Sequence, residues 1–245
     1  MLRKLISGFD RGEVAAYRKI KNGKRVLTNN TTGQECFDLS LIYPVQNKRF
    51  VGQLLNIQDT IIRRIIGNTN QYNYPQSAND FHLTFLSFVH EASLSETLRQ
   101  EYRDKALDLI HNKEKFLTPL KIHFFGGCIT QDAIIINGYN FQKLNESRVA
   151  AARYGMRVGL FSKESGLKNA FSILEHNVAD QNLAHMTLFR FNSTVDAETR
   201  AEINRVLQDV DFGEVVLSKL ELREIRRYGL LNGSQRIGSL LFTQP

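Results

Sequence analysis

The fold is decided by Phe81-His-Leu-Thr-Phe-Leu-Ser-Phe88 and Ala184-His-Met-Thr-Leu-Phe-Arg-Phe191, two apolar runs of the kind that form buried strands. Each run contains a histidine, an apolar residue, a threonine and another apolar residue. Because side chains alternate between the faces of a strand, His82 and Thr84 point the same way, as do His185 and Thr187. The chain therefore presents the same pair of polar side chains twice, once in each half.

A pair of imidazoles that face one cleft can act as general base and general acid. Two threonine hydroxyls beside them can hold an anion such as phosphate. The alternative is that both histidines are ordinary strand residues whose ring nitrogens bond to backbone. A single His-x-Thr is common by chance, so the argument rests on its repetition in the two halves.

The doubled His-x-Thr-x pattern, His82 to Phe85 and His185 to Leu188, resembles the two-histidine (2H) phosphoesterase superfamily. That superfamily includes RNA 2′,3′-cyclic phosphodiesterases, once called 2′-5′ RNA ligases, plant cyclic phosphodiesterases and viral 2′,5′-oligoadenylate phosphodiesterases. The resemblance covers roughly residues 36–243, and outside the motifs it is one of layout. It implies a bilobal duplicated fold, in which two antiparallel sheets flank a central groove and helices lie outside.

Periodicity along the chain predicts an α+β protein with one motif strand in each half. Residues 1–35 form an N-terminal extension of unknown role, and residues 36–245 form a single bilobal domain. Gln58 interrupts the apolar stripe of the first long helix. Asn232-Gly233 is a strong signal for a type I′ hairpin turn. The predicted strands are 37–43, 81–88, 118–129, 132–138, one near 156–161, 184–191, 214–231 and 236–242; the predicted helices are 50–66, 91–112, 165–177 and 197–210.

The composition is typical of a soluble protein, and its positive net charge favours the binding of anions. The net charge is +7 and the pI about 9.4, which raises the local concentration of polyanions, so a nucleotide or an RNA end is the expected partner. No stretch is apolar enough to span a bilayer, and the start of the chain is not a secretory signal. The two cysteines, Cys36 and Cys128, show no metal spacing, so we expect a reduced, cytoplasmic protein without membrane contact.

Other catalytic devices find no support in the sequence. Two histidines without a third ligand at regular spacing make a poor zinc site, so we expect neither metal nor cofactor. A Gly-x-Ser-x-Gly elbow and a Walker-type lysine loop are both absent. The resemblance implies a metal-independent phosphodiesterase that acts on a 2′,3′-cyclic phosphate or on a 2′,5′-linked or cyclic oligonucleotide. We expect His82 and His185 to be the acid–base pair and Thr84 and Thr187 to bind the phosphate; which histidine is the base is left open.

Several further residues are weaker candidates for the site. His123 alternates into a possible groove position, and Tyr228 is a candidate for stacking on a base. Strict alternation puts Arg190 on the face opposite the histidines. Leu86 and Phe88 are expected to share the face of His82, and Phe189 and Phe191 that of His185. The basic residues Lys219, Arg223, Arg226 and Arg227 form a solvated face first and a phosphate-contacting rim second.

Two other functions compete with the enzyme. One is a non-catalytic module of the same fold that binds a nucleotide, and the other is an RNA-end-binding protein whose N-terminal extension recruits a partner. The presence of both histidines and both threonines favours the enzyme, because a protein that only binds needs no acid–base pair.

Overall fold

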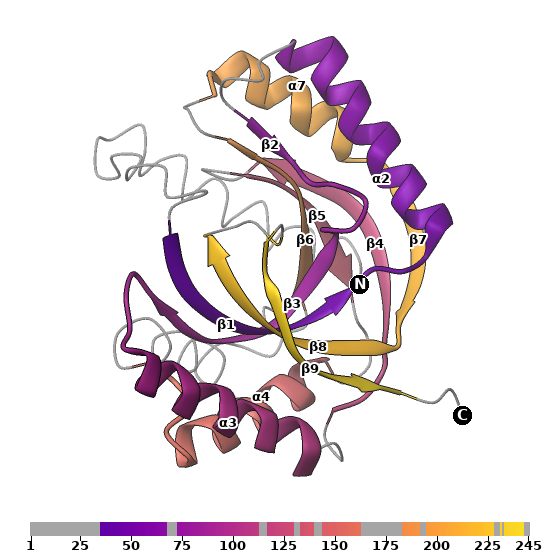
Figure 1. Cartoon of the computed structure of the whole chain (residues 1–245). Coiled ribbons are helices and arrows are strands. Elements are labelled where there is room, and N and C mark those ends of the chain that lie inside the picture. Colours follow the sequence, from indigo (N-terminus) through magenta and orange to yellow (C-terminus); the bar gives the residue numbers. More distant parts are fainter. Residues whose placement is uncertain are drawn as a thin grey trace.

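The computed structural model of the chain describes residues 35–67, 73–112, 117–129, 133–139, 144–162, 183–191, 195–227, 231 and 233–242. In these ranges the chain folds into one antiparallel sheet with helices packed on its outer faces (Figure 1). The strand order is β7-β4-β5-β6-β3-β1-β8-β9, and β2 pairs with β6 beside this path. The strands are β1 (Glu35–Pro44), β2 (Asn73–Pro75), β3 (His82–Glu91), β4 (Leu120–Ile129), β5 (Ala133–Tyr139), β6 (Leu183–Phe191), β7 (Asp211–Leu217), β8 (Lys219–Arg227) and β9 (Gln235–Leu241).

The two motif strands, β3 and β6, are neighbours at the centre of this sheet. In the described chain they pair at one position, Leu83 with Met186. On one side of this junction lie β1, β8 and β9, and on the other β5, β4 and β7. The expectation of two separate sheets is therefore corrected to one continuous sheet of two halves, joined by the motif strands themselves.

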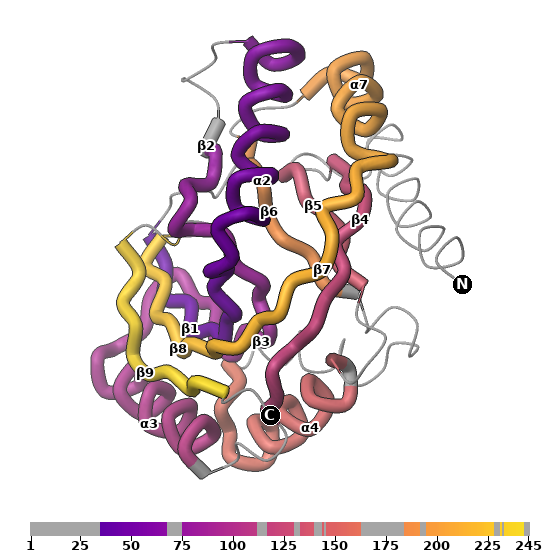
Figure 2. The backbone as a smooth tube through the Cα atoms, turned by 90° about the vertical axis from the view of Figure 1, so that its right-hand side faces the viewer, coloured from indigo at the N-terminus to yellow at the C-terminus, as the bar shows by residue number. Residues whose placement is uncertain are grey.

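Each half of the sheet has its own pair of helices. α2 (Lys48–Ile61), which a π-helical turn η1 (Ile62–Ile66) extends, and α7 (Ala197–Leu207) pack on the half that contains β4, β6 and β7. α3 (Glu96–Asn112) and α4 (Leu144–Arg157) pack on the half that contains β1, β3 and β9. Figure 2 shows the two helix pairs at opposite ends of the molecule. This arrangement leaves the other face of the central strands free of helices among the described residues.

The helices begin and end where local chemistry dictates. The Asn47 side chain accepts a hydrogen bond from the Phe50 amide and caps α2, and Asp196 caps α7 through the Thr199 amide. The predicted helices 50–66, 91–112 and 197–210 are confirmed with shifted ends. None of the described helices is both long and apolar enough to cross a membrane.

One predicted strand, near 156–161, is wrong. Residues up to Arg157 belong to α4, and a turn follows in which Gly159 has a φ of 65°. A Cβ on Gly155 would lie 2.7 Å from the Phe161 ring, so this glycine lets the chain fold back closely after the helix. The predicted strand 214–231 divides into β7 and β8. The predicted helix 165–177 and Asn232 of the hairpin turn lie outside the described residues, although β8 and β9 do pair as a hairpin.

Candidate active site

The site is organised around the pair formed by Leu83 and Met186. These are the middle residues of the two His-x-Thr motifs, both are fully buried, and they lie directly opposite each other on antiparallel strands. Their neighbours along each strand therefore point to the other face. Continuing the antiparallel register places His82 opposite Thr187 and Thr84 opposite His185. At this pair the two antiparallel motifs are related by a local twofold axis, with His82 and Thr187 on one side of it and Thr84 and His185 on the other.

A β-bulge follows the threonine in both motif strands. Thr84 pairs with Ile42 and Leu86 with Leu41, so Phe85 is the extra residue in β3. Thr187 pairs with Ile135 and Phe189 with Ile134, so Leu188 is the extra residue in β6. An extra residue moves the side chains that follow it to the other face, in β3 up to a second register shift between Ser87 and Val89.

The bulges correct the predictions that rested on strict alternation. Leu86, Phe88, Phe189 and Phe191 are buried in the core and do not share the face of the histidines. Arg190, predicted on the opposite face, lies close enough to both histidines for its charge to lower their pKa values.

A side chain from an outer helix holds each bulge. Arg148 of α4 donates from Nε to the Phe85 carbonyl and from Nη2 to the Thr84 carbonyl, both at 2.9 Å. Gln58 of α2 donates from Nε2 to the Leu188 carbonyl at 2.8 Å and to the Gln76 carbonyl at 3.0 Å. Buried carbonyls without a donor are costly, so these contacts stabilise the irregular backbone that fixes the direction of the threonines.

His82 is bonded to backbone at one ring nitrogen. Its Nδ1 lies 2.7 Å from the carbonyl oxygen of Asp80. A carbonyl can only accept, so Nδ1 carries a hydrogen and Nε2 is the nitrogen that can exchange a proton in the neutral ring. Burial lowers the pKa of His82, and the charge of Arg190 adds to this, whereas the bond to Asp80 works in the opposite direction.

His185 has a more cationic environment. Desolvation by the surrounding protein, followed by the charges of Arg148 and Arg190, lowers its pKa to about 4. Its side chain keeps contact with solvent, so it remains accessible to a ligand. On the next strand Asn137 is paired with His185 and shares its face; among the described residues, its buried Oδ1 has no hydrogen-bond partner. Both imidazoles are therefore neutral near pH 7 when no anion is bound.

The fold has counterparts among solved structures. TT0787 of Thermus thermophilus is 16% identical, with 84% of this chain and 97% of that chain covered and a TM-score of 0.54. LigT of E. coli in its apo form is 14% identical, with 86% and 99% covered and a TM-score of 0.51. The chain shares the fold of these two proteins.

At these identities the likeness concerns the fold alone, and the resemblance predicted from the two motifs is confirmed at that level. No protein-family model and no curated protein matches the chain in sequence.

One weaker candidate, His123, does not lie at the central pair of motif strands. His123 lies on β4, two strands from β6, with its Nε2 2.9 Å from Asp211 Oδ1. Its role in substrate contact stays a prediction. Tyr228 lies outside the described residues. Both cysteines are free thiols, and the described ranges contain no cluster of three or more His, Cys, Asp or Glu side chains that could hold a metal ion.

Sequence reasoning missed four residues that shape the site: Gln58, Asp80, Asn137 and Arg148. Gln58 gave a visible signal, because a polar residue in an apolar helical stripe needs a buried partner. Asp80 acts through its backbone, so its residue type carries no signal. The roles of Arg148 and Asn137 follow from strand and helix contacts distant in sequence, and no local pattern reports them.

Proposed function

We propose that this protein is a metal-independent phosphodiesterase that hydrolyses a nucleotide phosphodiester, either a 2′,3′-cyclic phosphate or a 2′,5′-linked or cyclic oligonucleotide. The observation that carries the proposal is the pairing of Leu83 with Met186, because it brings two histidines and two threonines onto one face of adjacent strands. A groove that only bound nucleotides would not need two imidazoles opposite two hydroxyls.

The reaction follows from this arrangement. Water attacks phosphorus and loses a proton to the neutral imidazole, while the other imidazole, protonated, gives its proton to the departing oxygen as the P–O bond breaks. A 2′,3′-cyclic phosphate then opens to a phosphate monoester with a free neighbouring hydroxyl. Thr84 and Thr187 donate hydrogen bonds to the non-bridging oxygens and stabilise the charge that develops there.

The charges around the two imidazoles favour His82 as the proton donor and His185 as the base. His82 bonds to the Asp80 carbonyl, which favours the protonated ring, and Asp80 and Asp38 act on it in the same sense. The charges of Arg148 and Arg190 both lower the pKa of His185. Arg190 acts on His82 in the same way, so Arg148 makes the difference between the two rings. The bound phosphate supplies the negative charge that the donor needs to hold its proton.

Hydrolysis in excess EDTA tests the proposal. The substrates are 2′,3′-cyclic nucleotides, 2′,5′-oligoadenylate and cyclic dinucleotides, and the variants are H82A, H185A and, as a control, H111A at an exposed histidine of α3. We expect turnover of one class, lost in the first two variants and kept in the control. Tight binding without turnover would instead favour the non-catalytic nucleotide-binding module.

A substrate with an activated leaving group tests the two roles. A nitrophenolate departs without a proton, so a p-nitrophenyl phosphodiester makes the general acid dispensable. We expect H82A to lose much less activity on the nitrophenyl ester than on the natural type of substrate, whereas H185A loses as much on both. The reverse pattern would exchange the roles of the histidines, and equal losses in all cases would show that neither residue acts as the acid.

A further inference from the structure

Strand β8 carries positively charged side chains on the same face as the catalytic pair. Glu221 of β8 pairs with Ile42 of β1, which in turn pairs with Thr84 of β3. Directly paired residues point to the same face, so Glu221 points to the same face of the sheet as Thr84. By alternation Lys219, Arg223 and Arg227 share this face.

The first group on this strand, the Glu221 cluster, consists of Glu221, Lys219, Arg223 and Arg236. The Glu221 side chain is only 3% exposed; Lys219 Nζ lies 2.6 Å and Arg223 Nη2 2.7 Å from its oxygens, and Arg236 Nη1 is 3.8 Å away. Burial opposes its charge, yet the bonds from Lys219 and Arg223 hold the pKa of Glu221 below its ordinary value. Three cations around one carboxylate leave an excess of positive charge, and Arg223 is further held by Ser234 Oγ at 3.0 Å.

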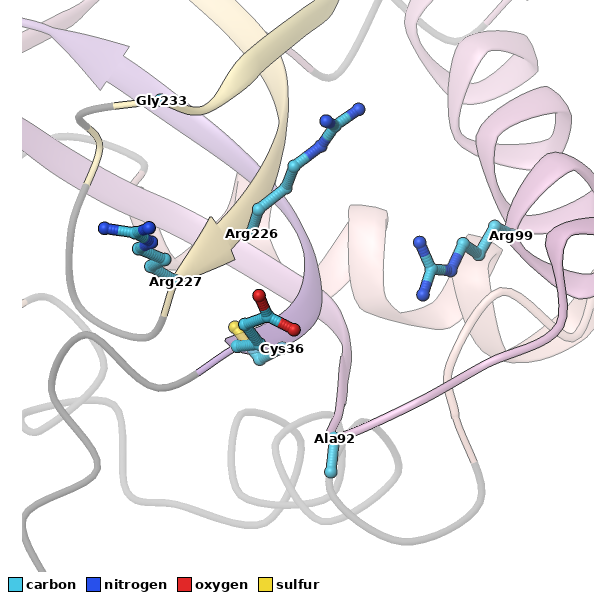
Figure 3. A pocket seen from close by; sticks show the side chains of 7 residues that line it. Cys36, Ala92, Arg99, Arg226, Arg227 and Gly233 are labelled. Atoms are coloured by element: carbon cyan, nitrogen blue, oxygen red, sulfur yellow. The ribbon is translucent and has the colours of Figure 1, made fainter.

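The second group lies at the far end of β8, where Arg227 pairs with Glu35. A cavity of about 680 Å³ opens there, which we call the arginine pocket; Arg226 and Arg227 come from β8 and Arg99 from α3 (Figure 3). Burial and the nearby Asp38 raise the pKa of Cys36 to about 11, so its thiol adds no negative charge. The pocket is lined by Glu35, Cys36, Ala92, Arg99, Arg226, Arg227 and Gly233. Arg227 comes from the face of Glu221, whereas Arg226 and Arg99 of α3 reach the pocket from the helix-covered face. Arg226 pairs with Glu224 at 3.3 Å, so Glu35 and Glu224 balance the three arginines in part.

The spacing of these groups identifies the kind of ligand. Two strand spacings, roughly 10 Å, separate Thr84 from Glu221, and the six residues from Glu221 to Arg227 add roughly 20 Å along β8. A mononucleotide at the histidines cannot reach the arginine pocket. Asp38 faces the stretch between the two groups, where Ser40 bonds to one of its carboxylate oxygens and His90 to the other.

We propose that β8 is a binding track for the sugar–phosphate chain of an oligonucleotide. The reacting phosphate lies at the two histidines, the next phosphates on the 5′ side contact Lys219, Arg223 and Arg236, and phosphates still further along enter the arginine pocket. This inference rests on the proposed function, and it selects an oligonucleotide end over a free cyclic mononucleotide as the substrate.

Binding of a product-like ligand tests the track independently of catalysis. The probes are fluorescent RNA oligonucleotides of two, four and eight nucleotides with a 3′-terminal phosphate, measured by anisotropy in EDTA over a range of KCl concentrations. We expect affinity to rise with length. R236Q should weaken binding of the four- and eight-nucleotide probes, and R227Q that of the eight-nucleotide probe only. Each lost phosphate contact should lower the slope of log K against log[KCl] by about 0.7.

The variants are chosen so that folding does not decide the outcome. Removing Arg223 would take a close partner from the buried Glu221 and could disturb folding. The Arg236 side chain is 56% exposed and lies 3.8 Å from Glu221. R236Q is therefore the primary variant, and the conservative R223K is the secondary one. R63Q is the matched control, because Arg63 is a 76% exposed arginine on η1 that pairs with Asp59. We expect R63Q to bind all probes like the wild type.

Two results would overturn the track: wild-type affinity that does not depend on length, or R227Q and R236Q that both bind like R63Q. A hydrolysis assay of the wild type with cyclic mononucleotides distinguishes a failure of the track from a failure of the proposed function. Turnover without length dependence rejects the track alone. Length-dependent binding without turnover of any substrate rejects the phosphodiesterase and retains a polyanion site on β8.

Discussion

The two halves of the molecule contain the same device, built with different chemistry. In each half a His-x-Thr strand bulges at the residue after the threonine, and a side chain from an outer helix bonds to the bulged carbonyl. In the half of β3 this side chain is the cation Arg148, and in the half of β6 it is the neutral Gln58. The repeated geometry positions two equal sets of the side chains that we propose to be catalytic, whereas the unequal helix residues give the histidines different electrostatic environments.

That difference teaches how a duplicated site can perform an asymmetric reaction. Acid–base catalysis needs one neutral and one protonated imidazole, and a perfectly symmetric pair would not distinguish them. Arg148 lowers the pKa of His185, while Gln58 has no charge with which to act on His82. The backbone carbonyl of Asp80 adds to the contrast, because it favours the protonated form of His82.

Removing the imidazoles should give the largest effect. We expect H82A and H185A each to lower kcat by roughly 10²–10⁴-fold, because each removes one proton transfer. Since the two residues act as a unit, the double variant should be far less impaired than the product of the single effects. Steady-state kinetics with a saturating substrate checks this, and one variant of near wild-type rate would contradict the idea that both halves contribute.

The threonines come next. T84V and T187V keep the side-chain shape and remove the hydroxyl, so each should lower kcat/KM by roughly 10²-fold through loss of one hydrogen bond to the phosphate. Equal losses in T84V and T187V would indicate that the two halves contact the bound phosphate equally, as the local twofold axis leads us to expect. A large loss in one variant and none in the other would show that the two halves hold the phosphate unequally. Thr60, a half-buried threonine on α2 whose hydroxyl donates to the Asn56 carbonyl, provides the control T60V.

The two helix residues can be compared through stability. R148A leaves the carbonyls of Thr84 and Phe85 without this donor, and Q58A does the same to those of Leu188 and Gln76. We expect each to lower the free energy of unfolding by about 1–3 kcal/mol. Urea denaturation measures this, and R148A should also reduce kcat because it frees Thr84. A stability like that of the wild type in both variants would mean that the bulges do not need these side chains.

The pH dependence should show the smallest but most specific effect. Both imidazoles have lowered pKa values, so the state with one proton on the pair is most populated below pH 6.5, and kcat/KM should fall as the pH rises above the upper pKa. R148Q makes the two helix residues alike and removes a charge that disfavours protonated His185. The pKa of His185 should then rise, and NMR titration of its ring in the unliganded protein would show it. An unchanged pKa of His185 in R148Q would show that Arg148 does not cause the difference between the two histidines.

Much of this molecule was readable from local patterns. The spacing of His82 and Thr84, and of His185 and Thr187, identified the strands and the polar face, and the structure places all four residues at one junction. Periodicity located α2, α3 and α7 within a few residues. It failed where glycines and alanines made the pattern ambiguous, as before Gly155 and Gly159, where α4 takes the place of a predicted strand.

The sequence by itself determined the residue types that can transfer protons and bind phosphate, and their shared face on each strand, because alternation is a property of the local backbone. Only the tertiary structure decided that the two motif strands join one continuous sheet through Leu83 and Met186. It also decided that the bulges in these strands turn Arg190 toward the histidines and turn four apolar side chains into the core. A bulge exists only relative to the partner strand, and its carbonyls are satisfied by Arg148 and Gln58 from helices far away in the sequence. Such relations depend on long-range packing, which no local period encodes.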